Sequence, residues 1–306
     1  MWEMILEESK KIGIHDLAII HPHRDPSLKE LLNRRKEEGR QLSIEEENIA
    51  LRVDPFLSLP PCQSMFVLFY QIPYELEKGN PSKEMGELAS ISWGEDYHRI
   101  LTRQLEELDE FLRGKIGETY QSYFQVDTGP LYERYFAEKT GRGSRGKNGS
   151  FIHKDLGSFV AIGLLLTNIE IKKMEEKMLP SLCGRCQKCI ENCPGGAISE
   201  EGIVDPRKCR SWITQKKEEL TVWEEILMGN SLYGCDICQK VCPQNRNIQK
   251  RNQEENLIQE ISLEEIETLS NRECKKKFGH LSGFWRGPKL WKRNAQIIRK
   301  NQNSML

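Results

Sequence analysis

Eight cysteines crowd into one short stretch of the chain, and this feature constrains the fold most. Of ten cysteines in 306 residues, eight lie between positions 183 and 242. Cysteines grouped in this way form disulfides in exported proteins but bind metal in a reducing compartment. The N-terminus, MWEMILEESKK, lacks the basic stretch and apolar segment of a signal peptide. We therefore expect a cytoplasmic protein whose clustered cysteines are metal ligands.

The spacing of these cysteines predicts two [4Fe–4S] clusters. The run CGRCQKCIENCP, from Cys183, has the spacing C-x2-C-x2-C-x3-C-P of bacterial ferredoxins with two clusters, in which the fourth cysteine ligates the other cluster. A second run, CDICQKVCP from Cys235, lacks the leading cysteine, and Leu232 stands in its place. Cys209 is the one cysteine of the stretch that remains to complete the second set.

This count gives a crossed assignment of ligands. One cluster takes Cys183, Cys186, Cys189 and Cys242, and the other takes Cys193, Cys209, Cys235 and Cys238. Structural zinc is the alternative for the same residues, but two crossed runs that end in Cys-Pro favour clusters. Cys62 and Cys274 stand apart, and we expect incidental thiols or small buried side chains there. Because such clusters only pass electrons, another part of the chain must use them.

Apolar patterns predict a mixed α and β fold of the α+β class. Strands are expected at 16–20, 64–70 and 119–127, with one long strand or a hairpin over 159–171. Amphipathic helices are expected at 96–114 and 131–139. We expect three parts: an α/β cofactor and substrate domain over 1–172, a ferredoxin-like domain with two clusters over 173–248, and a basic helical C-terminal segment over 249–306.

The charge distribution suggests an anionic partner. From Ser270 to Leu306 there are ten Lys or Arg and one acid, although the net charge of the chain is −1. Phe284, Trp285 and Trp291 are interleaved with these bases, a pattern that favours RNA through phosphate attraction and base stacking. A solvated helical face is the alternative. The longest apolar run, Val160 to Leu166, is too short to span a bilayer, so we expect no membrane contact.

A glycine-rich stretch, TGRGSRGKNGS (140–150), contains G-x-G-x-x-G at Gly141, Gly143 and Gly146. A dinucleotide fingerprint needs a strand before it and a helix after it, whereas the preceding YERYFAEK has a helical pattern. We therefore expect a loop whose backbone N–H groups suit a phosphate or the edge of a cofactor. An ordinary surface loop is the alternative.

In order and over nearly its whole length, the sequence resembles the epoxyqueuosine reductases, cobalamin-dependent iron–sulfur enzymes of tRNA modification. The resemblance lies in WGEDYH (93–98), QVDTGPLYER (125–134), GRGSRGKN (141–148), KCRSWIT (208–214), YGCDICQKVCPQN (233–245) and FGHLSGFWRGPKLWKRNAQI (278–297). The cluster spacing alone is common, but this combination of motifs is specific.

The resemblance implies cobalamin on the α/β domain, with both clusters feeding it electrons. The implied substrate is the epoxide of a queuosine-type base in the tRNA anticodon, reduced by two electrons to an alkene while its oxygen leaves as water. Asp127 matches the family's proton donor; capping of the turn or of the next helix is the alternative role. The implied cofactor contacts are Tyr97, His98, Gly141, Gly143, Gly146, Lys147 and Asn148.

Three departures from the family pattern stand out. Arg142, Ser144 and Arg145 replace apolar residues in the glycine loop, and Glu95 stands where the family usually has Arg. The chain ends at Leu306, whereas many members continue into a helical-repeat domain that helps to hold tRNA. We expect a monomer that takes electrons from an unidentified low-potential donor. The alternative is an electron carrier or corrinoid reactivation protein without its own substrate chemistry; a reductive dehalogenase is a weaker one, since we see no export signal.

Overall fold

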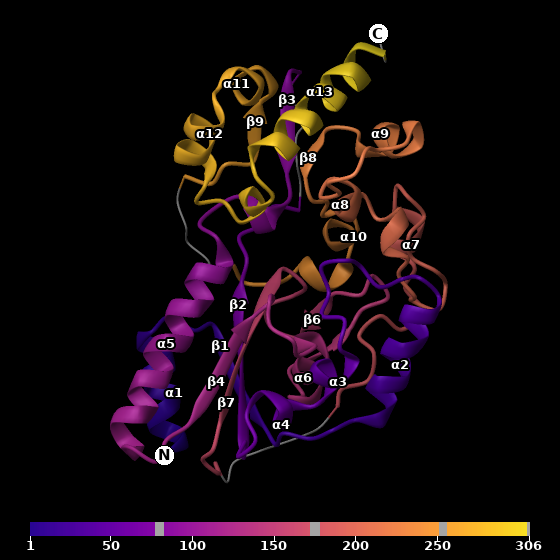
Figure 1. The fold of residues 1–306 in the computed structure, drawn as a ribbon. Coiled ribbons are helices and arrows are strands. Elements are labelled where there is room, and N and C mark those ends of the chain that lie inside the picture. Colours follow the sequence, from indigo (N-terminus) through magenta and orange to yellow (C-terminus); the bar gives the residue numbers. More distant parts are fainter. Residues whose placement is uncertain (77–82, 172–177, 251–255, 305–306) are drawn as a thin grey trace. The chain divides into compact units, whose positions relative to one another are not determined.

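The computed structural model describes residues 1–76, 83–171, 178–250 and 256–304 (Figure 1). The helices are α1 (Trp2–Lys11), α2 (Pro26–Glu37), α3 (Ile49–Val53), α4 (Pro55–Ser58), α5 (Tyr97–Ile116), α6 (Glu133–Lys139), α7 (Lys188–Glu191), α8 (Arg210–Ile213), α9 (Val222–Met228), α10 (Ile237–Lys240), α11 (Leu263–Thr268), α12 (Asn271–Phe278) and α13 (Pro288–Ser304). The strands are β1 (Asp16–Ile20), β2 (Ser64–Gln71), β3 (Met85–Leu88), β4 (Ser122–Val126), β5 (Gly143–Arg145), β6 (Phe151–His153), β7 (Val160–Thr167), β8 (Ser231–Tyr233) and β9 (Glu260–Ser262). Single 3-10 turns are η1 (Ser90–Ser92), η2 (Pro206–Lys208), η3 (Pro243–Asn245) and η4 (Ser282–Arg286).

The chain forms two compact units. The first comprises residues 1–71, 98–146 and 150–184, and the second comprises 72–97, 147–149 and 185–306. The basic C-terminal segment therefore belongs to the same unit as most of the clustered cysteines. The predicted three-part division stays a prediction, and its boundary at 172 lies outside the described residues. The predicted mixture of helices and strands is confirmed.

A four-stranded sheet in the order β1-β2-β7-β4 forms the centre of the first unit, and every neighbouring pair in it is antiparallel. Alternate residues point to opposite faces of a sheet. Residues such as Ala18, Val67 and Leu164 face a core that includes side chains of α2, α3 and α6. On the other face Leu101 and Leu105 of α5 pack on Gly163. Figure 1 shows α1 beside α5 on that side of the sheet.

The expected elements match the observed ones closely. The strands expected at 16–20, 64–70 and 119–127 are β1, β2 and β4, and the expected helices are α5 and α6. The apolar run 159–171 contains one strand, β7, up to Thr167. Thr167 is followed by a turn, and residues 172–177 lie outside the described part. Periodicity located α5, whereas β2 and β7 were located as continuous apolar runs because both are buried along nearly their whole length.

The second unit has a smaller core around a three-stranded sheet in the order β8-β3-β9. Trp93 and Trp291 are fully buried in it, together with Leu232 of β8 and Phe278 of α12. Helix α13 runs beside α11 and contributes Trp291 to this core. The C-terminal helices are therefore an integral part of the fold of this unit.

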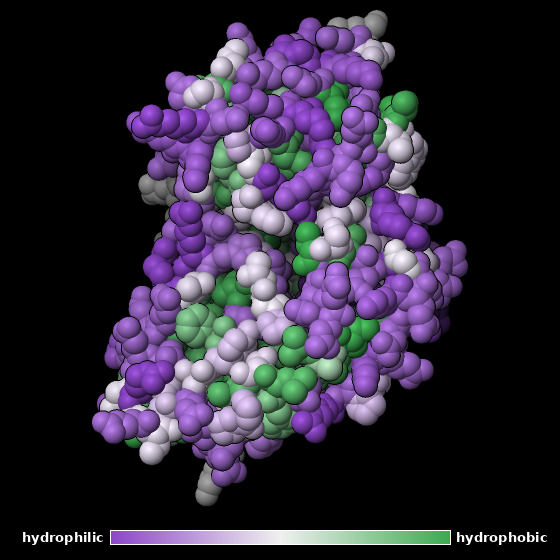
Figure 2. Space-filling view, viewed as in Figure 1, coloured by the Kyte–Doolittle hydropathy of each residue, from purple (hydrophilic) through white to green (hydrophobic). Residues whose placement is uncertain are grey.

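Hydrophilic residues cover most of the face shown in Figure 2, with smaller hydrophobic areas between them. This surface agrees with a mean hydropathy of −0.61. Among the helices in the described ranges, none is both long and apolar enough to cross a bilayer.

Candidate cluster centre and acid site

The two cysteine runs fold into the same turn twice. In the first run Ile190 N–H donates to Gln187 O at 2.9 Å, and in the second Gln239 N–H donates to Asp236 O at the same distance. Each turn is the start of one short helix, α7 or α10, and α7 and α10 contact each other. Cys189 and Cys238 occupy equivalent positions in these helices. The turns are thus a structural repeat, as the spacing predicted.

Backbone donors point at the cysteine sulfurs, as a cluster requires. Ala197 N–H donates to Cys193 Sγ at 3.3 Å. Burial raises the pKa of the Cys209 thiol, and it raises that of Cys235 to about 11. Iron supplies the positive charge that keeps such buried sulfurs deprotonated. None of the cysteines forms a disulfide. Over the described ranges, no group of three or more His, Cys, Asp or Glu is arranged to hold a single metal ion.

The two isolated cysteines are buried, which selects one of the two expected alternatives, a small buried side chain over an incidental surface thiol. Cys62 is 6% exposed and Cys274 is fully buried. Burial raises the pKa of Cys62 to about 12, so this thiol stays neutral. Both cysteines behave as small hydrophobic side chains.

Lys147 and Asn148 belong to the second unit and lie at the cysteine turns. Lys147 Nζ donates to Cys186 O at 3.0 Å, and the Asn148 side chain lies near Cys238 and opposes the rise in the pKa of its thiol. A Cβ added at Gly202 would lie 3.0 Å from Lys147 Cα, so the two backbones pass closely. The segment after the glycine loop is thereby fixed to the cysteine-rich region. A contact of either side chain with cobalamin stays a prediction.

We expect Asn148→Ala to lower the midpoint potential of the cluster that Cys238 ligates. A donor to a cluster sulfur stabilises the reduced, more negative state. A loss of about 1 kcal/mol corresponds to about 40 mV for one electron, since tenfold is about 59 mV. Potentiometric titration followed by electron paramagnetic resonance measures this shift. Asn33→Ala, on the exposed side of α2, is the control; equal shifts in both variants would contradict the assignment.

Asp127 lies directly after the last residue of β4, where the sequence placed it. Its φ is +54°, a left-handed conformation that few residues other than glycine adopt. His98, in the first turn of α5, approaches it with Nε2 at 3.3 Å from Asp127 Oδ2. The Asp127 side chain is 59% exposed. This pair combines a carboxyl group and an imidazole that can exchange a proton with a bound molecule.

The capping alternative for Asp127 is not observed at the next helix. The residue that precedes α6 is Tyr132, and no side chain caps this helix. Tyr97, at the start of α5, is 9% exposed, and Glu95 pairs through its backbone with Leu281. The contact of Tyr97 with a cofactor stays a prediction.

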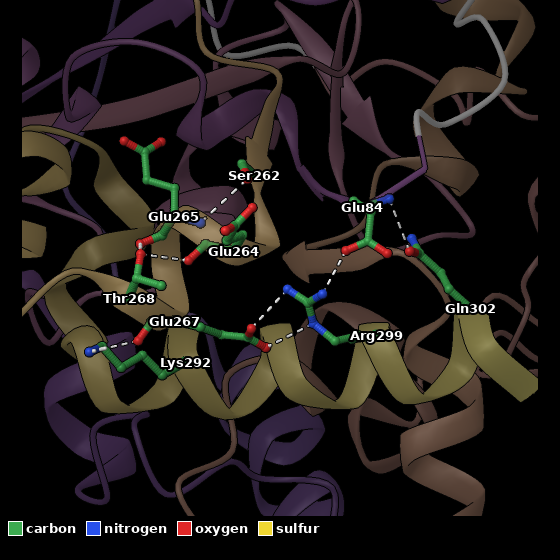
Figure 3. A network of polar contacts seen from close by, with 9 residues as sticks. All are labelled: Glu84, Ser262, Glu264, Glu265, Glu267, Thr268, Lys292, Arg299 and Gln302. Carbon is green, nitrogen blue, oxygen red and sulfur yellow. Dashed lines mark hydrogen bonds and ion pairs between the residues drawn. The ribbon is translucent and has the colours of Figure 1, made fainter.

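The base-rich C-terminal helix α13 uses its polar side chains for hydrogen bonds and ion pairs within the second unit. Arg299 donates from Nη1 to Glu84 Oε2 at 2.7 Å and from Nη2 to Glu267 Oε2 at 2.8 Å (Figure 3). Arg293 Nη1 donates to Lys216 O at 2.7 Å. Asn294 Nδ2 donates to Thr214 O at 2.8 Å and to Leu232 O at 2.9 Å. The Arg293-Asn294 pair therefore ties backbone that follows Cys209 and backbone that precedes Cys235.

The expected base-stacking role of the interleaved aromatics is wrong for two of the three. Trp291 is fully buried and Phe284 is 6% exposed, because both belong to the core of the second unit. Trp285 is 56% exposed. Charge and aromatic count could not separate a helix packed on a core from an RNA-binding tail.

The sequence patterns did not identify Gln125 and Glu133 as residues of the acid site. Gln125 Nε2 donates to Glu133 Oε1 at 2.9 Å, so the two side chains meet beside the Asp127 loop. The signal was a polar residue in a buried strand, with a carboxyl group in the first turn of the next helix. Neither feature indicates which residue the side chain contacts, because the contact forms only when the loop folds back.

Two protein-family models match the chain. One is described as epoxyqueuosine reductase QueG, DUF1730, and matches residues 52–128; the other is a 4Fe-4S double cluster binding domain and matches 182–245. An epoxyqueuosine reductase of Bacillus cereus is 36% identical over 300 residues, which are 95% of this chain and 78% of that protein. The chain belongs to the epoxyqueuosine reductase family.

Solved structures of the family agree with this fold. A crystal structure of epoxyqueuosine reductase with an epoxyqueuosine-modified tRNA-Tyr stem loop has a TM-score of 0.92 and 33% identity, and covers 98% of this chain and 81% of that chain. The Bacillus subtilis enzyme, with its aspartate catalytic loop swung out of the active site, has a TM-score of 0.91 and 32% identity, with the same coverage. The resemblance inferred from the motifs and the fold class are both confirmed.

The family's cofactors are two [4Fe–4S] clusters and cobalamin, and the cysteines present fit the clusters. Seven cysteines in the two matching runs, together with Cys209, form no disulfide and are the donor set for the clusters. The assignment of each cysteine to one cluster stays a prediction.

For cobalamin, the glycine loop is the relevant segment, and it forms a hairpin of β5 and β6. A Cβ at Gly143 would lie 2.0 Å from Ile152 O, so this position requires glycine. The helix α6 precedes the hairpin, which excludes the strand-loop-helix of a dinucleotide site.

The departures from the family pattern in this hairpin are compensated within the first unit. Arg142 Nε lies 3.3 Å from Asp16 Oδ2, and Arg145 Nε lies 3.3 Å from Glu138 Oε1. Ser144 Oγ accepts a hydrogen bond from Leu182 N–H at 3.0 Å. The two arginines are thus neutralised by the chain's own carboxylates. The charged substitutions are compatible with a corrinoid beside the hairpin.

Proposed function

We propose that this chain reduces the epoxide of epoxyqueuosine in tRNA and so produces queuosine. The observation that carries the proposal is the presence of both cysteine turns and the Asp127–His98 pair in one chain of this family. Cysteine turns alone would fit a carrier. A carboxyl group held at a strand end, next to an imidazole, adds the proton chemistry that an enzyme needs.

The reaction has a defined balance. Removal of the epoxide oxygen as water leaves an alkene and consumes two electrons and two protons. The clusters ligated by the eight cysteines deliver the electrons one at a time. Asp127 provides a proton to the departing oxygen, and His98 orients the carboxyl group and can restore its proton. Cobalamin, when bound, supplies the low-valent metal centre that no side chain can replace.

The test is an anaerobic assay of the iron-reconstituted protein with cobalamin, a low-potential reductant and tRNA that carries epoxyqueuosine. Nucleoside mass spectrometry should detect queuosine only when cobalamin is added. Absence of product, with both clusters intact and cobalamin bound, would leave the electron-carrier alternative. That alternative is not favoured, because the relatives that match most of the chain are epoxyqueuosine reductases.

For the tRNA contact we propose the exposed lysines of α12. Lys275 and Lys276 are exposed, whereas Lys277 pairs with Glu265. We expect Lys275→Ala with Lys276→Ala to weaken tRNA binding and to reduce the salt slope by about 1 per lysine. Titrations at several salt concentrations measure both effects. Lys29→Ala with Lys36→Ala, on α2, removes the same charge elsewhere; an identical loss in this control would remove the specific role of α12.

We also propose that the reaction takes place in the cytoplasm, where its tRNA substrate is. The electron donor is proposed to be a low-potential carrier protein, and the chain to act as a monomer. Light scattering during size-exclusion chromatography measures the oligomeric state directly. A stable dimer at micromolar concentration would contradict the monomer.

A further inference from the structure

The loop between β4 and α6 has a conformation that its sequence alone does not stabilise. Asp127 has φ +54°, which costs free energy for a residue with a side chain. Thr128 N–H donates a hydrogen bond to Val126 O at 2.5 Å, so the chain turns sharply here. A Cβ at Gly129 would lie 2.3 Å from the Gln125 side chain. The turn thus packs directly against Gln125, which lies on β4 before the loop.

The side-chain amide of Gln125 hydrogen-bonds the end of the loop through both its oxygen and its nitrogen. Its Oε1 accepts from Leu131 N–H at 3.1 Å, and its Nε2 donates to Leu131 O at 3.0 Å. Gln125 is 5% exposed, so water does not compete for these bonds. Leu131 is itself 2% exposed. The Gln125 side chain therefore fixes the backbone at the end of the loop, at Leu131.

Glu133 completes the clamp and reaches the Asp127 backbone. Its Oε1 accepts the second bond from Gln125 Nε2, at 2.9 Å, and its carboxyl group also accepts a bond from the Asp127 backbone N–H. Glu133 is the first residue of α6, where the N–H groups have no side-chain cap. Its carboxyl group is thus committed to the Asp127 loop rather than to its own helix.

Three ionisable groups surround this carboxyl group. Asp127 faces it from the loop, Arg134 follows it on α6, and Tyr123 lies on β4. Burial and the Asp127 carboxylate raise the pKa of Glu133 to about 8. Glu133 is therefore largely protonated at neutral pH, and it places no second negative charge beside Asp127. His98 faces Asp127 from α5.

We propose that Glu133 is a positioning residue for the proton donor: through the Gln125 amide and the Asp127 backbone N–H, it holds Asp127 in its working place. This inference rests on the proposed role of Asp127 as the acid. It concerns the state of the loop and adds no new chemical step. Without this carboxyl group, the left-handed turn at Asp127 has one hydrogen bond fewer and should relax.

The kinetic test compares two substitutions at the same position. Glu133→Ala removes both acceptors, and we expect kcat to fall about 10- to 100-fold, because small displacements of a catalytic group cost this much. The KM for tRNA should change less than twofold. Glu133→Gln keeps one neutral acceptor oxygen in nearly the same place, so it should retain more activity than Glu133→Ala at pH 7. Failure of Gln to rescue, with kcat equal to that of Ala, would overturn the proposal.

The pH profile gives a second readout. Above about pH 8 Glu133 ionises in the wild type, and repulsion from the Asp127 carboxylate should loosen the loop. Wild-type kcat should then fall as the pH rises through about 8. In Glu133→Gln this alkaline decrease should be absent. An unchanged alkaline limb in the Gln variant would contradict the positioning role.

Hydrogen exchange reports on the loop without any turnover. Backbone amides of 126–132 should exchange at least tenfold faster in Glu133→Ala than in the wild type, while amides of β7 keep their rate. Glu110→Gln, an exposed carboxyl group on α5, is the matched control. Loss of activity in Asp127→Asn, together with wild-type kcat and wild-type exchange rates in Glu133→Ala, would refute only the positioning role. Full activity of Asp127→Asn would instead refute the acid on which the inference rests.

Discussion

Replacing Asp127 with asparagine should lower the turnover of epoxyqueuosine tRNA by about 10²- to 10⁴-fold, the usual contribution of a general acid. Asparagine has nearly the shape of the carboxyl group and tolerates the left-handed backbone at this position, where φ is +54°. It cannot transfer a proton. The variant should therefore fold with both clusters present and bind cobalamin as before. Single-turnover kinetics with nucleoside mass spectrometry measure the loss.

The control for this experiment is Asp155→Asn, an exposed carboxyl group in the turn after β6 of the same unit. It should keep wild-type turnover. Iron content and the electron paramagnetic resonance spectra of reduced samples show whether the clusters survive. Turnover within twofold of the wild type in Asp127→Asn would exclude this residue as the acid, and His98, which lies 3.3 Å from it, would become the next candidate.

How much of this site the sequence could predict depends on how each residue is positioned. Asp127 was located correctly, because the alternating pattern over 119–127 and the Thr-Gly-Pro turn after it placed this residue at a strand end, although β4 itself ends one residue earlier, at Val126. The two cysteine turns were located by spacing, since ligands within one turn are set by local geometry. Gln125 and Glu133 were not found, because their contact depends on the loop between them folding back.

The C-terminal segment shows the limit of charge patterns. Ten bases against one acid suggested an anionic partner, yet Arg299 forms ion pairs with Glu84 and Glu267 in the same unit. Lys300 likewise pairs with Glu225. Glu84 and Glu225 lie far away in the sequence, and Glu267 lies just before the counted segment, so the local count included none of them. Trp291 was misread for the same reason, because its core is formed by distant elements.

Replacing Cys209 with alanine should remove one cluster and leave the other. Cys209 precedes α8 and is separated in sequence from both cysteine runs, so the crossed assignment depends on it most. The iron content should fall from about eight to about four atoms per chain, because each cubane holds about four irons. Turnover should be lost, since electrons can no longer pass through both clusters. Iron analysis and electron paramagnetic resonance measure the first effect, and nucleoside mass spectrometry measures the second.

Cys62→Ala and Cys274→Ala are the matched controls, because both cysteines are buried outside the cysteine runs. They should keep the full iron content, although Cys274 is fully buried and its loss leaves a small cavity. Two intact clusters in Cys209→Ala would mean that a non-cysteine ligand or solvent completes the second cubane. Leu232, which replaces the missing cysteine of the second run, is fully buried and has no ligating atom in its side chain. It therefore cannot take that place, which is why we propose Cys209 as the residue on which the second cluster depends.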